Sequence, residues 1–278
     1  MNRKAMMRLA IDAVGAVSSA AFGPVASILT SAVKEMLSRH LSDKEAERTI
    51  FCMVAVANKI KANLDAGASL RGDGYFEKPK RGRSQSEQIA ENVLMKAQRE
   101  PEDKKQHYLA NLLANLSFDW GGKPGIYGRV DPWTANSMIA TAESLSYRQL
   151  CLLRMIDLAQ PIGTTPAPHP LPGGTYLKDR KSVGQHMFPI LYEVWDLLNR
   201  DLVRTDGHVF LGIEDIDFGK LKLSLPYEKT LVFLLGLDDI PDAEIENWRE
   251  LMFAPEAPVT GVPDGGYVII ANSLNIGS

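Results

Sequence analysis

The sequence predicts a mainly α-helical protein, with an N-terminal helical bundle followed by a smaller α+β domain that is winged-helix-like. Apolar residues with helical spacing and helix-start signals dominate as far as residue 159. Strand signals, which are short alternating runs beside glycine, gather after residue 182. We therefore expect a helical domain over residues 1–159, a proline-rich connector over residues 160–181 and an α+β domain over residues 182–278.

Two segments between residues 84 and 118 carry the clearest helix signals. Ser84 and Glu87 have the spacing of a capping box, in which each side chain bonds to a free backbone N–H. Pro101 cannot continue that helix because it lacks an N–H, and we expect it at the first position of the next helix. The two apolar faces consist of Ile89, Val93, Leu94 and Ala97 in the first helix and Leu109, Leu112, Leu113 and Leu116 in the second.

Further helices are predicted from the same kinds of signal. Ser42 and Glu45 form a second capping box, Asp131 is an N-cap followed by Pro132, and Ser146 begins a third box. The helix after Ser42 has an apolar seam with alternating steps of four and three, which suits a bundle core or a dimer interface. This seam consists of Ala46, Ile50, Met53, Ala57, Ile60 and Leu64.

The C-terminal part alternates between helix and strand signals. A helix is expected over residues 187–198, then a hairpin that pairs residues 202–205 with residues 208–211 around Asp206-Gly207. A strand around Leu221, a helix from Pro226 to Gly236, another helix after Pro241 and a terminal strand complete the order. A DNA-binding winged helix presents a basic recognition helix, but the corresponding segment here is acidic. We therefore interpret this domain as a structural or protein-interaction unit.

Charge is unevenly distributed along the chain. Residues 1–130 hold 20 Lys and Arg against 14 Asp and Glu, whereas residues 131–278 hold 11 against 20. The two halves could therefore pair with each other or offer separate surfaces to separate partners. Cys52 and Cys151 lie in apolar helical patterns, which is typical of free, buried thiols in a reducing cytosol.

The N-terminal stretch imitates a signal peptide but lacks its composition. A cationic tip precedes the run Leu9–Val33, which is rich in Ala, Ser and Gly and contains Asp12. We expect a helical hairpin with a hinge at Gly23-Pro24, whose small residues suit close helix packing or association in lipid. The candidate membrane or partner face consists of Arg3, Lys4, Arg8, Gly15, Ala16, Ser19, Ala20 and Gly23.

A glycine-rich basic loop over residues 67–86 is the candidate site for nucleic acid or an anionic surface. Its cations could neutralise phosphates, and Tyr75 and Phe76 could stack on bases. The alternative is an ordinary solvated loop. The candidate binding residues are Arg71, Lys78, Lys80, Arg81 and Arg83.

The sequence contains no convincing catalytic motif. It has no Walker A loop, no Gly-x-Ser-x-Gly elbow and no His-Glu-x-x-His, and its five histidines are scattered. Asp179-Arg180-Lys181 resembles part of a metal-dependent nuclease site, and the acidic group Glu214, Asp215 and Asp217 could hold a hard cation. Neither pattern has a second element at a suitable distance, so we interpret both as solvated surface charge. We expect no enzymatic activity, no cofactor and no metal site.

Three stretches resemble bacterial proteins of the abortive-infection alpha type, which are associated with phage resistance. They read Tyr-Leu-Ala-Asn-Leu-Leu-Ala-Asn-Leu from residue 108, Leu-Ser-Tyr-Arg-Gln-Leu-Cys-Leu-Leu from residue 145 and Trp-Asp-Leu-Leu-Asn-Arg-Asp-Leu-Val from residue 195. The resemblance covers about half of the chain and implies a cellular setting in defence, with no catalytic residues to transfer.

We therefore expect a non-enzymatic helical interaction or effector protein in anti-phage defence, with a protein partner or a second copy of the chain. It would be cytoplasmic, and association with a membrane on activation is part of this hypothesis. One alternative is a nucleic-acid-binding regulator that uses residues 71–83. A second alternative is a metal-dependent nuclease.

Overall fold

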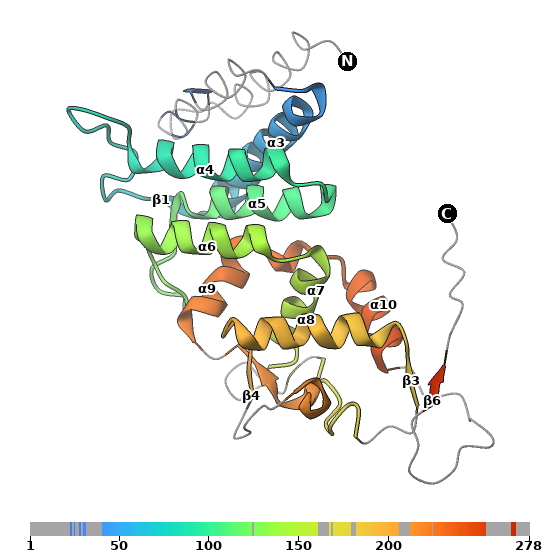
Figure 1. Ribbon diagram of the computed structural model, residues 1–278. Helices are drawn as coiled ribbons and strands as arrows, with labels where there is room; N and C mark the ends of the chain where they lie inside the picture. The colour runs from blue at the N-terminus through green and yellow to red at the C-terminus, as the bar shows by residue number, and fades with distance from the viewer. Residues whose placement is uncertain are drawn as a thin grey trace. The chain divides into compact units, whose positions relative to one another are not determined.

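A computed structural model describes residues 23, 25, 28, 30–31, 41–123, 125–160, 167, 169–178, 182–205, 212–223, 225–253 and 268–270. These residues are mainly helical, which confirms the predicted fold class (Figure 1). The α-helices are α3 (Asp43–Asp65), α4 (Gln85–Arg99), α5 (Asp103–Asn115), α6 (Pro132–Ser144), α7 (Tyr147–Leu158), α8 (Met187–Asn199), α9 (Pro226–Leu235) and α10 (Asp242–Phe253). The 3-10 helices are η2 (Ile213–Asp215), η3 (Phe218–Lys220) and η4 (Leu237–Asp239).

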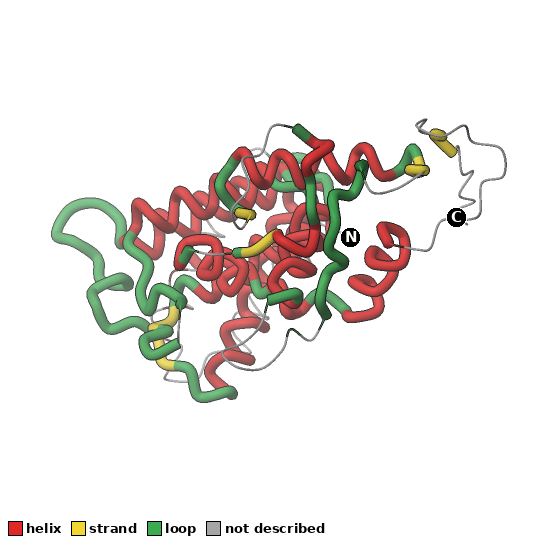
Figure 2. Tube along the Cα trace, turned by 90° about the horizontal axis from the view of Figure 1, so that it is seen from below, coloured by secondary structure: helices red, strands yellow, loops and turns green. Residues whose placement is uncertain are grey.

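The described strands are short and form pairs (Figure 2). β1 (Ser69–Leu70) is antiparallel to β2 (Phe118–Asp119), and β3 (Ser182–Gly184) is parallel to β6 (Val268–Ile270). β4 (Arg204–Thr205) pairs with β5 (Leu221–Lys222), a long-range partner that the predicted local hairpin did not include. Residues 206–211, the other half of that hairpin, lie outside the described residues, so the winged-helix-like detail stays a prediction.

The chain divides into two compact units, of which the first comprises Met1–Tyr147 and Lys229–Leu237 and the second Arg148–Glu228 and Asp238–Ser278. The predicted domains were instead contiguous in sequence, over residues 1–159 and 182–278, with the connector over residues 160–181 between them. Side chains of α5 form hydrogen bonds that hold the segment Lys229–Leu237 in the first unit. Asn111 donates to the carbonyl of Leu235 at 3.2 Å, and Asn115 donates to that of Leu234 at 2.8 Å. Bonds of such long sequence separation leave no local signal.

Helix α5 is the centre of the first unit. It packs against α3, α4 and α6, and every residue from Tyr108 to Asn115 is buried. Lys105 and Glu100 form an ion pair of 2.6 Å whose side chains are both less than a tenth exposed. The apolar faces predicted for α4 and α5 form the core, together with Met53, Val56 and Ile60 of α3.

The local start signals define several helix ends. The capping boxes predicted at Ser42 and Ser84 are present, and Asp131 accepts hydrogen bonds from the first turn of α6. The predicted start at Pro101 was wrong, because Glu102 keeps an extended backbone and α5 begins at Asp103. The Glu102 carboxylate instead accepts a hydrogen bond from the N–H of Tyr147 at 2.9 Å.

In the second unit, part of the proline-rich connector is bound to α10. The Tyr176 hydroxyl donates to the carbonyl of Met252 at 2.7 Å, and Arg249 donates to the carbonyl of His169 at 3.0 Å. Tyr176 also packs edge-on against Phe218 and is almost completely buried. These contacts make the described part of the predicted connector a packed segment.

None of the helices in the described ranges combines the length and the apolarity that crossing a membrane requires.

Candidate interaction sites

The basic loop between β1 and α4 is held at its start by Arg71. This side chain is only 4% exposed, and its guanidinium donates to both carboxylate oxygens of Asp73 at 3.2 and 2.6 Å. It also donates to the carbonyl of Val130 at 2.8 Å. The hydrogen bonds from Arg71 lower the pKa of Asp73 below its ordinary value. Arg71 therefore fixes the loop in place, with three of its guanidinium N–H groups bonded inside the protein.

Two other cations of the loop are paired with carboxylates of α4. Lys78 forms an ion pair with Glu87 at 2.7 Å, and Arg83 forms one with Glu91. Burial raises the pKa of Glu87, but the combined bonds from Lys78 and Ser84 outweigh it and leave the pKa below its ordinary value. These pairs reduce the positive charge that the loop offers to an external anion.

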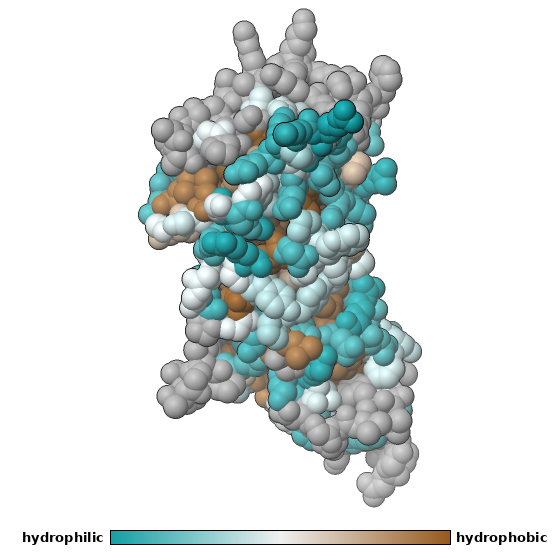
Figure 3. Space-filling view, turned by 90° about the vertical axis from the view of Figure 1, so that its left-hand side faces the viewer, coloured by the Kyte–Doolittle hydropathy of each residue, from teal (hydrophilic) through white to brown (hydrophobic). Residues whose placement is uncertain are grey.

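Lys80 and Arg81 are the predicted anion-binding residues that stay open. Both are exposed, and neither forms a hydrogen bond or ion pair within the part of the chain that the structure describes. Figure 3, in which the side carrying the loop faces the reader, shows hydrophilic side chains projecting from the upper part of the described surface. Tyr75 is 2% exposed and Phe76 packs edge-on against it, so the Tyr75 ring is not presented for stacking.

The predicted membrane or partner face lies almost wholly outside the described residues. Only Gly23 of that set is described, and it is helical and exposed. Val25 and Ile28, which follow it, are buried with exposed fractions of 3% and 6%. Arg3, Lys4 and Arg8 belong to the part of the chain that the structure does not describe, as do Gly15, Ala16, Ser19 and Ala20.

An exposed tryptophan at the start of α6 is a feature that the sequence analysis missed. Trp133 is 85% exposed, although it follows directly on a firmly capped helix start. Asp131 accepts hydrogen bonds from the backbone N–H groups of Trp133 and Thr134 at 2.9 and 3.1 Å and from the Thr134 hydroxyl at 2.6 Å. The Thr134 hydroxyl, with these N–H groups, lowers the pKa of Asp131. Trp133 is thus held rigidly at its backbone while its ring faces solvent.

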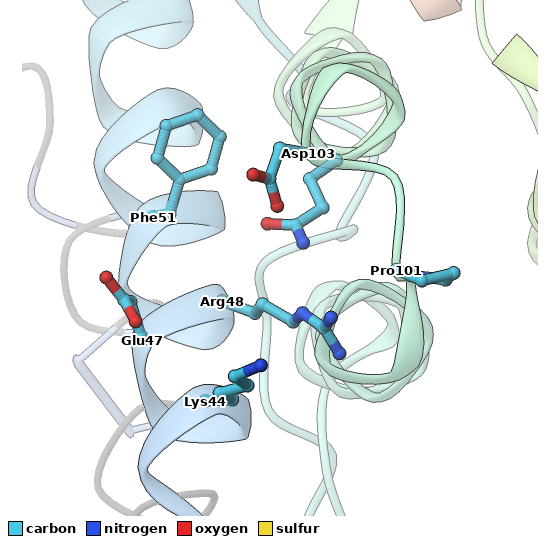
Figure 4. Close-up of a pocket in the computed structure, with 7 residues that line it drawn as sticks. Lys44, Glu47, Arg48, Phe51, Pro101 and Asp103 are labelled. Atoms are coloured by element: carbon cyan, nitrogen blue, oxygen red, sulfur yellow. The ribbon is translucent and has the colours of Figure 1, made fainter. Parts of the chain in front are cut away.

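A pocket of about 430 Å³ between α3 and the start of α5 was also missed (Figure 4). Its residues come from two segments that are at least 50 positions apart, so no local pattern indicated it. The residues that line it are Lys44, Glu47, Arg48, Phe51, Pro101, Asp103 and Gln106.

The nuclease candidates show no metal-binding geometry in the described ranges. Asp179 and Lys181 lie outside them, and Asp215 is paired with Lys178 at 2.5 Å. Asp217 is 3.3 Å from Lys220 and caps the N–H of Gly219. Within the described residues, no group of three or more His, Cys, Asp or Glu side chains could hold a metal ion.

Comparisons with protein-family models, with curated proteins and with solved structures give no match for this chain.

Proposed function

We propose that this chain is a non-enzymatic interaction protein that binds a protein partner, or a second copy of itself, through the surface around Trp133. The 85% exposure of Trp133 is the observation that carries the proposal. A tryptophan ring combines a large apolar area with few rotatable bonds, and tryptophan is enriched among the residues that contribute most to binding energy. The firm cap at Asp131 limits the backbone ordering that binding would cost.

The resemblance to abortive-infection proteins supports a role in bacterial defence against phage. The segments on which the resemblance is based include residues 108–116 and 145–153, and both contribute buried helix faces in the structure. A protein that acts in this way needs a trigger or target, and a protein-binding surface is the simplest means of recognising one. In this setting, the exposed Trp133 ring on α6 would contact the trigger or the target.

The test is phage plating on bacteria that express the wild type, Trp133→Ser or Tyr192→Ser. Tyr192 on α8 is 59% exposed and serves as the matched control for losing an exposed aromatic ring. Protection is expected from the wild type and Tyr192→Ser, and its loss from Trp133→Ser, with circular dichroism showing all three folded. No protection by the wild type, or full protection by Trp133→Ser, would refute the proposal.

The second candidate function is nucleic-acid binding, which the open side chains of Lys80 and Arg81 favour. Each phosphate contact adds a counterion-release contribution, so this binding would weaken steeply as salt rises. Lys80→Gln/Arg81→Gln removes both open cations and leaves the internal pairs of the loop intact. Electrophoretic mobility shifts with single-stranded RNA and duplex DNA that are unchanged by this double substitution would exclude the loop as the binding site.

The membrane step of the proposal concerns the N-terminal cations. Arg3, Lys4 and Arg8 would contribute about 1 kcal/mol each near an anionic leaflet. Co-sedimentation with vesicles that contain phosphatidylserine is expected for the wild type and reduced for Arg3→Gln/Lys4→Gln/Arg8→Gln. Equal co-sedimentation of the two proteins, or none by the wild type, would remove the membrane step.

A further inference from the structure

One face of α3 lines the pocket of the first unit. Lys44, Glu47, Arg48 and Phe51 follow at i, i+3, i+4 and i+7, which places them along one side of the helix. The opposite wall comes from Pro101 and the first turns of α5. The volume, about 430 Å³, lies in the range of sites that hold a small organic molecule.

The charges in the pocket are segregated. In Figure 4 the nitrogen atoms of Lys44 and Arg48 lie toward one end, and the Asp103 carboxylate lies toward the other end, facing the Phe51 ring. The Glu47 carboxylate lies on the side of α3 that is turned away from α5 in this view. The pocket thus offers a cationic end and an anionic end with a flat aromatic ring near the anionic one.

The charged groups of the pocket have unused bonding capacity. Within the described ranges, neither Lys44, Arg48 nor Asp103 forms a side-chain hydrogen bond or an ion pair. Arg48 is half-buried, which weakens the competition of water for its guanidinium. A guanidinium fork beside an ammonium group binds a phosphate well, since the fork donates two parallel bonds and the ammonium adds charge.

The Phe51 side chain is 48% exposed in the pocket wall, so a flat ligand ring could cover it. Any nucleobase can stack on the face of a phenylalanine ring, because every base has a π-face. Asp103, as a carboxylate, only accepts hydrogen bonds, so it favours a ring with N–H donors, and an exocyclic amino group supplies two of them at the ring edge. Gln106, which lines the same wall, is almost fully buried and donates to the carbonyl of Glu100 at 3.0 Å, which fixes this wall.

We infer that this pocket binds a mononucleotide with an amino-bearing base. The phosphate lies against Lys44 and Arg48, the base stacks on Phe51, and its exocyclic amino group donates to Asp103. This binding role is independent of the proposed surface at Trp133, and neither depends on the other.

Isothermal titration of the full chain with AMP, GMP, CMP, UMP and inorganic phosphate tests the inference. At least one of the three amino-bearing nucleotides is expected to bind, and UMP is expected to bind about tenfold more weakly because its base offers Asp103 a single ring N–H and no amino group. Affinity weaker than about 1 mM for all four nucleotides would overturn the inference. So would equal affinity for inorganic phosphate, which would leave a simple anion site.

Substitutions locate the ligand. Lys44→Gln/Arg48→Gln should weaken binding of the best nucleotide by more than about tenfold, whereas Lys80→Gln/Arg81→Gln, with the same loss of charge, should leave it unchanged. Phe51→Leu should weaken the binding of the nucleotide but not the binding of inorganic phosphate. Asp103→Asn should reduce the difference in affinity between the amino-bearing nucleotide and UMP. Loss of binding in the loop variant with retention in the pocket variant would overturn the inference, and thermal melts confirm that each variant is folded.

Discussion

The Arg71 guanidinium lies over the ring of Tyr75, 4.2 Å from the ring centroid, and both side chains are buried. The arrangement joins a cation–π contact to the bonds with Asp73 and Val130. The Tyr75 hydroxyl is buried without a hydrogen-bond partner within the described residues, and burial raises its pKa. The loop that follows is therefore attached through a largely desolvated cation, although its sequence is typical of solvated loops.

We expect Arg71→Ala to lower the free energy of unfolding by about 3 kcal/mol, the scale for removing one partner of a largely buried ion pair. The reason is that Asp73 and the carbonyl of Val130 lose their donor together. Arg81→Ala on the same loop is the control, and it should change stability by less than about 0.5 kcal/mol because the side chain is exposed. Urea unfolding measures both, and equal effects would show that Arg71 is as dispensable as a surface residue.

We expect Ser84→Ala to destabilise the protein by about 1–2 kcal/mol, and Ser42→Ala by less, near the lower end of the range for N-caps. The two serines have the same role but different surroundings. Ser84 is 1% exposed and its hydroxyl also bonds to that of Ser86 at 2.9 Å, whereas Ser42 is exposed. Thermal denaturation compares the pair. A larger loss at Ser42 would mean that burial does not strengthen the cap at Ser84.

Helix ends were predictable because their causes are local. Ser84, Asp131 and Gly236 each act within a few residues of the helix end that they define, so a single sequence contains the whole signal. The start at Pro101 failed because the neighbouring Glu102 bonds to Tyr147, which lies 45 positions away. The apolar faces of α4 and α5 were predictable for the same local reason as the caps.

The candidate sites were less predictable because they depend on distant neighbours. Nothing near Trp133 in sequence says that no other element covers it, and the pocket needs α3 and α5 to be brought together. The burial of Arg71 did leave a signal. Asp73 and Tyr75 lie within four residues of Arg71, so the sequence itself contains a carboxylate for an ion pair and a ring for a cation–π contact.

We expect the stabilising contribution of Glu87 to depend on pH. Its pKa in the folded protein is below the ordinary value of 4.5, so the unfolded state takes up a proton more readily. The stability that Glu87 adds is therefore fully present above pH 4.5 and is lost as the pH falls through the lower folded-state pKa. Urea unfolding between pH 3 and 7 should show the difference between the wild type and Glu87→Gln shrinking on the acid side.

Lys78→Gln provides the control for this pH dependence. It removes the ammonium that lies 2.7 Å from Glu87 and keeps the backbone bond between Glu87 and Ser84. The loss of stability on acidification should then be smaller than in the wild type. Burial still raises the pKa of Glu87, while one of the bonds that lower this pKa is gone. A difference between the wild type and Glu87→Gln that stays constant over this pH range would contradict the lowered pKa.

The end of α9 gives a last prediction, which separates backbone strain from a steric clash. Gly236 follows the helix with a φ of 62°, and a Cβ there would lie 2.8 Å from Nδ2 of Asn111. Asn111 cannot move away freely, since it is buried and that same nitrogen donates to the carbonyl of Leu235. Gly67 has a φ of 85° after α3, but a Cβ there would meet nothing within 4 Å.

We therefore expect Gly67→Ala to cost about 1 kcal/mol, which is the strain of a left-handed alanine alone. Gly236→Ala should lower the free energy of unfolding by about 1–3 kcal/mol more than Gly67→Ala does. This extra loss is the penalty expected when the buried Asn111 amide loses its hydrogen-bond partner. Adding Asn111→Ala to Gly236→Ala removes the clashing amide, so the double variant should be less destabilised than the sum of the two single variants. Urea unfolding of the wild type, Gly236→Ala, Asn111→Ala and the double variant measures this coupling. Strictly additive losses of stability would show that Asn111 and Gly236 do not interact.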